Sequence, residues 1–158
     1  MKILLDIDGV MIPAKSWQTY QMDSDGFGMF SKHAVIGLNR IIKSMSNPEI
    51  ILTTSHKHKF TLSEWSELFL KRGVIVTKMN RLHTNSLNVS RIEEVKSWYL
   101  KNLNEPFIVL DDDKGLNDLD INFKNDHLIL TSSSVGLNSL SADEAIKKIE
   151  LQFNLQIL

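Results

Sequence analysis

The sequence predicts an α/β domain in which helices cover both faces of a mainly parallel five-stranded sheet. Short runs of Ile, Leu and Val without polar alternation are typical of strands that are buried on both faces. Segments with the spacing of amphipathic helices lie between these runs, and strands that alternate with helices form βαβ units. The sequence therefore predicts a three-layer, Rossmann-like domain.

Each predicted element can be located by its residues. The strands are expected at residues 3–5, 50–52, 74–76, 107–110 and 127–130, and the helices at 31–45, 62–71, 91–103 and from near residue 141 onward. Three serines are candidate helix N-caps: Ser31, Ser63 and Ser90. Gly73 fits the end of the second helix, and Asp143 and Glu144 fit the first turn of the last one.

Composition limits the possible classes of function. With 158 residues, of which 42% are hydrophobic, the chain suits a single domain over residues 1–158. It has no cysteine, which excludes disulfides, thiolate catalysis and zinc sites built on cysteine. A formal net charge of −1 gives no global attraction to nucleic acid or to an anionic membrane.

The sequence has no recognisable targeting or membrane segment. Asp6 and Asp8 interrupt the first apolar run, which is unlike the core of a signal peptide. No stretch approaches the ~18 apolar residues of a membrane span. We therefore expect a soluble cytoplasmic protein without a membrane partner, and we make no prediction of its oligomeric state.

Polar side chains follow three of the expected strands, at the edge where open α/β sheets bind ligands. They are Asp6 and Asp8 after the first strand, Thr53 and Thr54 after the second, and Asp111 and Asp112 after the fourth. Acids gathered at one edge repel one another unless a cation neutralises them, and Mg²⁺ prefers carboxylate oxygens together with substrate phosphate. An acidic turn that caps a helix would account for one of these clusters, but poorly for their convergence.

The order of these motifs resembles the haloacid dehalogenase (HAD) superfamily. An apolar strand leads into Asp6-Ile7-Asp8-Gly9-Val10, and a strand ending in Thr53, a basic residue and a strand ending in Asp111-Asp112 follow. Finer similarity lies in three segments: Ala34-Val35 with Leu38-Asn39-x-Ile41-Ile42, Arg91-Ile92-Glu93-Glu94-Val95-x-x-Trp98, and Gly136-Leu137 before Ala145-Ile146. Over nearly the whole chain these features look like a small capless branch, the HAD domains of Swiss Army Knife RNA-repair proteins.

The resemblance implies that the acids divide the chemistry between them. Asp6 would attack phosphorus and form an aspartyl-phosphate. Asp8 would protonate the leaving oxygen and then activate water. The implied cofactor is Mg²⁺, held by the Asp6 side chain, the Asp8 backbone carbonyl and Asp111, with Asp112 close by.

The resemblance also implies which residues bind the phosphate. Thr53 matches the phosphate-binding hydroxyl, and Thr54 is the alternative. Arg91 matches the basic residue that offsets the charge of nucleophile and phosphate, with Lys57 and Lys96 as lesser candidates. The wider superfamily usually has lysine at the Arg91 position, and a guanidinium is not equivalent to a compact ammonium.

Residues 11–30 are too few for a cap domain, so we expect a short flap insertion and an open site. Trp17, Tyr20, Phe27 and Phe30 lie in this flap, where aromatic rings could stack a base or simply pack the flap onto the domain. The candidates for substrate binding are Gly9, Trp17, Phe27, Thr54 and Lys57.

The sequence thus favours an Mg²⁺-dependent phosphatase acting on a phosphorylated small molecule, a nucleotide or a nucleic-acid end. One alternative is a catalytically silent HAD-like binding module, against which the intact pair of Asp6 and Asp8 argues. The other is a receiver-type signalling domain, whose phospho-acceptor follows the third strand. This sequence has Thr77 and Lys78 after the expected third strand, and no aspartate.

Overall fold

The computed structural model describes residues 1–15, 17, 19–83 and 88–156. Its strands are β1 (Lys2–Leu5), β2 (Glu49–Leu52), β3 (Lys78–Arg81), β4 (Phe107–Asp111) and β5 (Leu128–Leu130). Its helices are α1 (Lys32–Lys43), α2 (Leu62–Lys71), α3 (Arg91–Lys101), α4 (Ile121–His127) and α5 (Ser139–Gln156), with a 3₁₀ turn η1 (Lys114–Asp118). In this described part, no helix is both long enough and apolar enough to cross a membrane.

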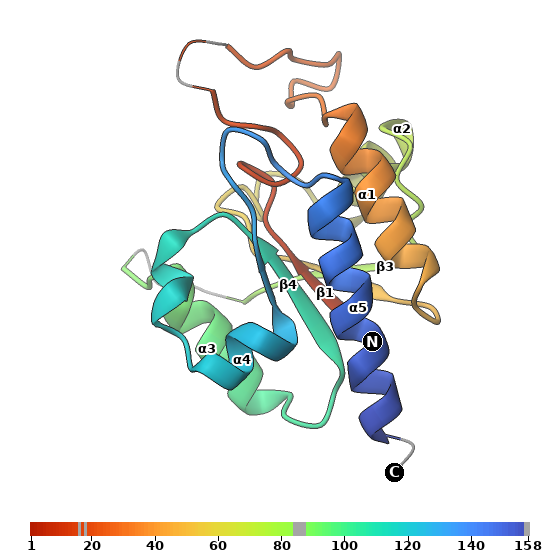
Figure 1. Ribbon diagram of the computed structural model, residues 1–158. Helices are drawn as coiled ribbons and strands as arrows, with labels where there is room; N and C mark the ends of the chain where they lie inside the picture. Colours follow the sequence, from red (N-terminus) through yellow and green to blue (C-terminus); the bar gives the residue numbers. More distant parts are fainter. Residues whose placement is uncertain (16, 18, 84–87, 157–158) are drawn as a thin grey trace.

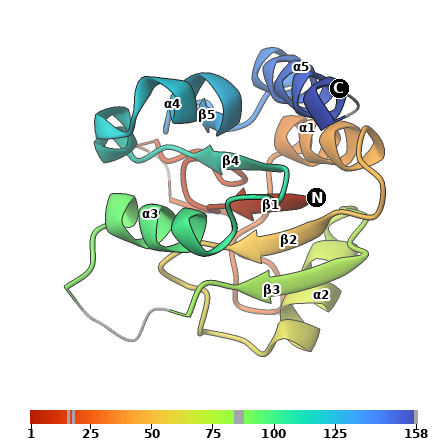
Figure 2. The ribbon, with the colours of Figure 1, turned by 90° about the horizontal axis from the view of Figure 1, so that it is seen from below.

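The five strands form one parallel sheet in the order β3-β2-β1-β4-β5 (Figure 2). Leu5, at the end of β1, pairs in register with Leu52 of β2 and Leu110 of β4. The residues that follow these three positions therefore emerge at the same edge. In this order the chain reverses direction across the sheet between β1 and β4, which is where such folds bind ligands.

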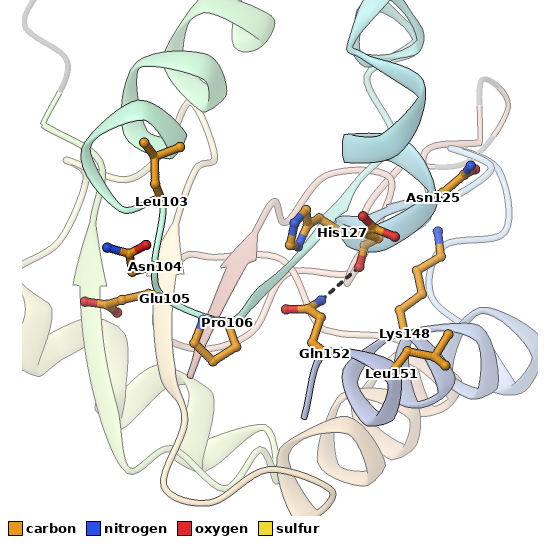
Figure 3. Close-up of a pocket in the computed structure, with 10 residues that line it drawn as sticks. Leu103, Asn104, Glu105, Pro106, Asn125, His127, Lys148, Leu151 and Gln152 are labelled. Carbon is orange, nitrogen blue, oxygen red and sulfur yellow. Dashed lines mark hydrogen bonds between the residues drawn. The ribbon is translucent and has the colours of Figure 1, made fainter. Parts of the chain in front are cut away.

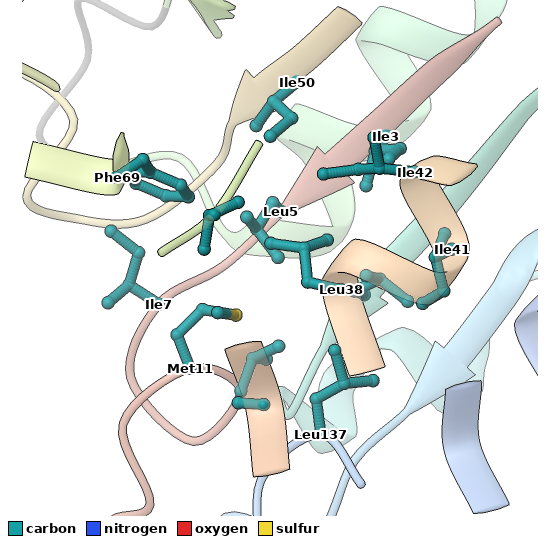
Figure 4. Close-up of a cluster of buried hydrophobic side chains, with 14 of the residues drawn as sticks. Ile3, Leu5, Ile7, Met11, Leu38, Ile41, Ile42, Ile50, Phe69 and Leu137 are labelled. Atoms are coloured by element: carbon teal, nitrogen blue, oxygen red, sulfur yellow. The ribbon is translucent and has the colours of Figure 1, made fainter. Parts of the chain in front are cut away.

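Two hydrophobic layers hold the helices to the sheet. Ile3 and Leu5 of β1 belong to one layer and Leu4 to the other, because successive side chains of a strand point to opposite faces. Figure 4 shows part of the first layer, in which the strands meet α1, α2 and α5. The second layer joins the sheet to α3, η1 and α4, on the opposite side (Figure 1). The predicted three-layer α/β fold is confirmed.

The helix boundaries follow local capping. The Ser31 hydroxyl accepts a hydrogen bond from the Ala34 N–H, and Ser90 caps α3, so both predictions are confirmed. Ser63 was the wrong choice for α2, since Thr61 caps that helix and forms a reciprocal capping box with Glu64. Helix α5 begins slightly before the expected position, at Ser139. Helix α4 was not predicted, because its seven residues are too few to show clear periodicity.

The expected strand at residues 74–76 is wrong, and the third strand is β3, which begins at Lys78. Val74 is buried, but the backbone N–H of Ile75 donates to the Asn39 side chain instead of to a neighbouring strand. Strand β3 has the largely polar sequence Lys-Met-Asn-Arg and lies at the sheet edge, where one side has no strand partner among the described residues. A search for strands buried on both faces misses an edge strand of this kind.

The flap between β1 and α1 is fastened to α2 by a buried arginine. Its tip is a small hairpin in which Met22 bridges Gly28. The Arg72 guanidinium donates to both Asp25 carboxylate oxygens, at 2.7 and 2.9 Å, and to the carbonyl of Phe27. This bidentate pair restrains the hairpin beside the edge where the acids emerge.

Asp25→Asn is expected to lower the free energy of unfolding at pH 7 by about 2 kcal/mol, because it weakens a bidentate pair with a buried guanidinium. The hydrogen bonds from Arg72 lower the pKa of Asp25 to about 2. A carboxyl whose folded pKa lies below its unfolded value stabilises the fold above about pH 4, and this contribution disappears as the pH falls toward 2. In urea unfolding, the difference between variant and wild type should therefore shrink toward zero at low pH. Asp143→Asn, which disrupts the exposed pair with Arg40, is the control and should change stability little.

Candidate functional site

Three aspartates meet at the carboxyl ends of β1 and β4. Carboxylate oxygens of Asp6, Asp111 and Asp112 lie within 4.8 Å of one another. Asp6 and Asp111 are buried, and burial raises the pKa of both carboxyls, an effect that the nearby Arg91 opposes. The buried Oδ2 of Asp111 accepts no hydrogen bond within the described residues. Clustered hard oxygen donors with spare coordinating capacity suit a divalent cation such as Mg²⁺.

Arg91 connects the ends of three strands. It is the first residue of α3, and its Nη2 lies 3.6 Å from Asp6 Oδ1 while Nη1 lies 3.3 Å from Asp111 Oδ2. Nη1 also donates to the backbone carbonyl of Thr53. The Ser90 cap fixes the start of α3, and it therefore fixes the backbone position from which the Arg91 side chain extends. The predicted base is therefore brought into the cluster of predicted acids.

Thr53 and Thr54 differ in how their hydroxyls are used, although both residues are fully buried. The Thr54 Oγ1 accepts a hydrogen bond from the His56 N–H, at 3.3 Å. The Thr53 Oγ1 has no hydrogen-bond partner within the described residues. A buried hydroxyl without a partner costs about 1–3 kcal/mol, so its presence at this edge fits a position that a ligand oxygen completes. Of the two candidate hydroxyls, that of Thr53 is therefore the one with no hydrogen bond in the described part of the chain.

Asp8 lies at the solvent side of the cluster and has two neighbours that the sequence did not connect with it. Its Oδ2 lies 2.9 Å from His56 Nε2. Tyr20 also lies near Asp8, since burial together with the charges of Asp8 and Asp112 raises the pKa of Tyr20. His56 follows Thr53 closely in the chain, and this short spacing after a strand end was the available signal. Residues of two separate loops thus lie near Asp8, and His56 is the one that contacts its carboxylate directly.

Gly9 allows the first and fourth strand ends to approach closely. It has a φ of +73°, and a Cβ there would lie 2.0 Å from an Asp112 carboxylate oxygen. Its carbonyl accepts a hydrogen bond from the Thr131 hydroxyl at 2.8 Å. A side chain at Gly9 would therefore displace Asp112 from the acidic cluster. This packing explains the glycine at this position, and the expected substrate contact of Gly9 stays a prediction.

Trp17 and Phe27, two aromatic residues expected to contact substrate, differ in exposure. Trp17 is 77% exposed and lines a cavity of about 710 Å³ in the flap, together with Lys15, Tyr20 and Lys32. Phe27 is only 5% exposed, and its ring packs edge-to-face on Trp65 and on His56, so its expected substrate contact stays a prediction.

Lys57 is also turned inward rather than toward a substrate. It is 6% exposed, and its ammonium lies 3.1 Å from Glu94 Oε1. The side chain that was expected to bind phosphate therefore already neutralises a carboxylate of the protein. Lys57 therefore lies on the far side of Glu94 from Arg91 and adds a positive charge there.

A second cavity, of about 370 Å³, lies at the opposite end of the sheet (Figure 3). It is lined by Pro106, just before β4, and by His127 and Gln152. The Gln152 side-chain amide donates hydrogen bonds to the carbonyls of Phe107 and Asp126, so both of its N–H groups already have partners within the protein. The cavity contains none of the clustered acids and lies away from the carboxyl ends of the strands, so it is not the candidate site.

Comparison with known families agrees with the site geometry. The family model described as the HAD domain in Swiss Army Knife RNA repair proteins matches residues 2–142, which contain all five strands, the three aspartates and Arg91. No curated protein and no solved structure gives a match. Because the match covers most of the chain, the chain belongs to the family of HAD domains found in Swiss Army Knife RNA-repair proteins.

Proposed function

We propose that this protein is a Mg²⁺-dependent phosphomonoester hydrolase in which Asp6 is the nucleophile. The observation that supports the proposal most strongly is the setting of Asp6. Its carboxylate lies beside the Arg91 guanidinium and two further aspartates. Arg91 also donates to the backbone carbonyl of Thr53, whose hydroxyl has no hydrogen-bond partner among the described residues. Acids for a cation, a guanidinium and a hydroxyl for phosphate oxygens, and a carboxylate nucleophile are the components that phosphoryl transfer requires.

The proposed reaction has two displacements. An Asp6 oxygen attacks phosphorus, the bond to the leaving oxygen breaks, and Asp8 supplies the proton to that oxygen. Asp8 then removes a proton from water, which attacks the aspartyl-phosphate, releases inorganic phosphate and restores Asp6. Arg91 and Thr53 bind the phosphate oxygens in both steps and stabilise the charge that develops on them.

The proposed cation site consists of the carboxylates of Asp6, Asp111 and Asp112 with the backbone carbonyl of Asp8. The carboxylates at this edge, those of Asp8 and Glu94 included, outnumber the cations Arg91 and Lys57, so a divalent cation reduces an unfavourable excess of negative charge. When bound, Mg²⁺ supplies a Lewis acid that also orients the phosphate.

Strand order argues against the receiver alternative. Receiver domains share the flavodoxin-like order 2-1-3-4-5, in which β1 and β3 are neighbours. Here β1 lies between β2 and β4, and β3 forms the edge of the sheet. The residues that follow β3, Leu82 and His83, include no phospho-acceptor aspartate. A silent binding module is disfavoured because the chain carries a residue for each role: nucleophile, acid–base group, phosphate-binding base and cation ligand.

The flap cavity supports a substrate with an aromatic group near its phosphate. The exposed Trp17 and the basic residues Lys15 and Lys32 line this cavity. Tyr20 lines it too, and the charge of Asp8 acts on Tyr20, so the cavity adjoins the acids. Base stacking on an aromatic ring contributes about 1–3 kcal/mol. We therefore include nucleotides and nucleic-acid ends, alongside small phosphorylated molecules, among the proposed substrates.

An aryl phosphate assay tests the proposed function. Wild-type protein with Mg²⁺ should release inorganic phosphate, and chelation with EDTA should remove the activity, which added Mg²⁺ should restore. Oligonucleotides phosphorylated at the 5′ or 3′ end should then be preferred over sugar phosphates. Absence of Mg²⁺-dependent turnover on every substrate would contradict the proposal, while a clear preference for sugar phosphates would contradict only the nucleotide assignment.

A further inference from the structure

A buried ion pair lies directly behind Arg91. The Lys57 ammonium lies 3.1 Å from Glu94 Oε1, and both side chains are less than a tenth exposed. The other oxygen of Glu94, Oε2, lies 3.8 Å from Arg91 Nε. Groups of alternating charge thus lie next to one another from the site inward: the site aspartates, Arg91, Glu94 and Lys57.

We propose that Lys57 and Glu94 are positioning residues that orient the Arg91 guanidinium toward the phosphate. The inference rests on the proposed function, because it concerns how the same site binds phosphate. It assigns to Lys57 an indirect role through Glu94, in place of the direct phosphate contact that the sequence predicted.

The backbone around Lys57 keeps its side chain facing inward. The Lys57 carbonyl accepts hydrogen bonds from Trp65 Nε1 at 3.2 Å and from Arg81 Nη1 at 2.9 Å. Arg81 also donates to the Phe60 carbonyl, and Trp65 is fully buried, so the loop after β2 is held at both ends. Reaching a phosphate at the acidic cluster would require Lys57 to leave the buried carboxylate of Glu94 without a partner, which is strongly unfavourable.

The guanidinium of Arg91 is shared between two groups of acids. Its Nη atoms face Asp6 and Asp111, while Nε faces Glu94. Glu94 therefore anchors the Nε edge of Arg91 while the Nη atoms face the site, and a Glu94 without Lys57 beside it would compete with the site for the guanidinium. Because Lys57 neutralises Glu94 from the other side, it weakens the pull of Glu94 on Arg91 and leaves the Nη atoms directed at the site.

This arrangement also explains why an arginine suits the position. A guanidinium has donors in fixed directions, and here they serve the Thr53 carbonyl, two site aspartates and Glu94 at once. An ammonium at this position could not face Glu94 and the site aspartates in fixed directions simultaneously. Glu94 and Lys57 thus form an ion pair that holds the Arg91 guanidinium in its orientation.

A double-mutant cycle tests whether Lys57 acts through Glu94. The variants are Lys57→Met, Glu94→Gln and the double variant, and the measurements are KM and kcat for an aryl phosphate and Kd for inorganic phosphate with Mg²⁺ present. Lys57→Met should raise KM and Kd about tenfold, with a smaller change in kcat, because small misplacements of a binding group can cost up to ~10²-fold. In the Glu94→Gln background the same substitution should change them less than about twofold.

A direct phosphate contact predicts a different cycle. If Lys57 bound phosphate itself, its removal would weaken binding equally with or without Glu94, and additive effects would overturn the inference. Lys57→Gln is made in parallel, since its amide can still donate to Glu94 and so preserves folding if the methionine variant does not fold. Lys148→Met is the matched control: Lys148 lies 3.0 Å from Glu144 at a distance from the site, so this change should lower stability without affecting phosphate binding.

The cycle separates failure of the inference from failure of the proposed function. Phosphate affinity is measured without turnover, so a wild-type protein that binds phosphate but hydrolyses nothing would overturn the function while the cycle still decides the role of Lys57. Normal turnover with an additive cycle would overturn only the positioning role. Absence of both turnover and phosphate binding in the wild type would overturn both.

Discussion

Asp6→Asn is expected to reduce turnover of an aryl phosphate by at least about 10³-fold, because the amide has nearly the same shape but cannot act as the nucleophile. The stability of the fold, in contrast to the activity, should not decrease. Burial raises the pKa of Asp6, and its charge is repelled by Asp8 and Asp112, so a neutral side chain relieves an unfavourable interaction in the metal-free protein. We expect the free energy of unfolding without Mg²⁺ to stay equal or rise.

Two measurements on the same preparation check this result: phosphate release with saturating Mg²⁺, and urea unfolding in EDTA. Asp113→Asn is the matched control, because Asp113 is in the same acidic run but its side chain caps η1 by accepting from the Gly115 N–H. That variant should retain activity and lose some stability. If Asp6→Asn retained wild-type turnover, another residue would have to be the nucleophile and the proposed mechanism would be wrong.

Among the strands, those that the sequence located most sharply are buried on both faces. Strands β1, β2 and β4 lie in the middle of the sheet, so their residues are largely apolar and their boundaries are sharp. Because these strands are parallel and in register, the positions of Asp6, Thr53 and Asp111 at one edge followed from the pattern alone. The sequence could therefore predict that the acids and the threonine lie at the same edge.

The parts that could not be predicted depend on tertiary contacts. Strand β3 pairs on one side only within the described chain, so tertiary pairing rather than apolar pattern decides where it lies. The inward turn of Lys57 depends on Glu94, which is 37 residues away in the chain. Nothing in a run of histidines and lysines shows which side chain faces the core. The contact between His56 and Asp8 likewise requires the β1 and β2 loops to meet in space.

Asp8→Asn is expected to slow steady-state turnover by at least about 10²-fold, because an amide can neither donate the proton to the leaving oxygen nor accept one from water. The introduced amide can still contact His56 and Tyr20, which face Asp8 in the wild type, so the geometry should be conserved. The experiment compares an aryl phosphate, whose leaving group departs readily without a proton, with an alkyl or nucleoside phosphate, whose leaving group needs one.

The two substrates should separate the two displacements. With the aryl phosphate, the variant should still form the aspartyl-phosphate, so it should release up to one equivalent of phenol in a fast phase and then turn over slowly because water is not activated. With the alkyl phosphate the first displacement is itself impaired, so no fast phase should appear. A uniform loss on both substrates without a fast phase would mean that Asp8 acts in orientation or cation binding rather than in proton transfer. Because Asp8 is more exposed than the buried Asp6 and Asp111, this comparison tests whether its exposed position serves proton exchange with the leaving oxygen and with water.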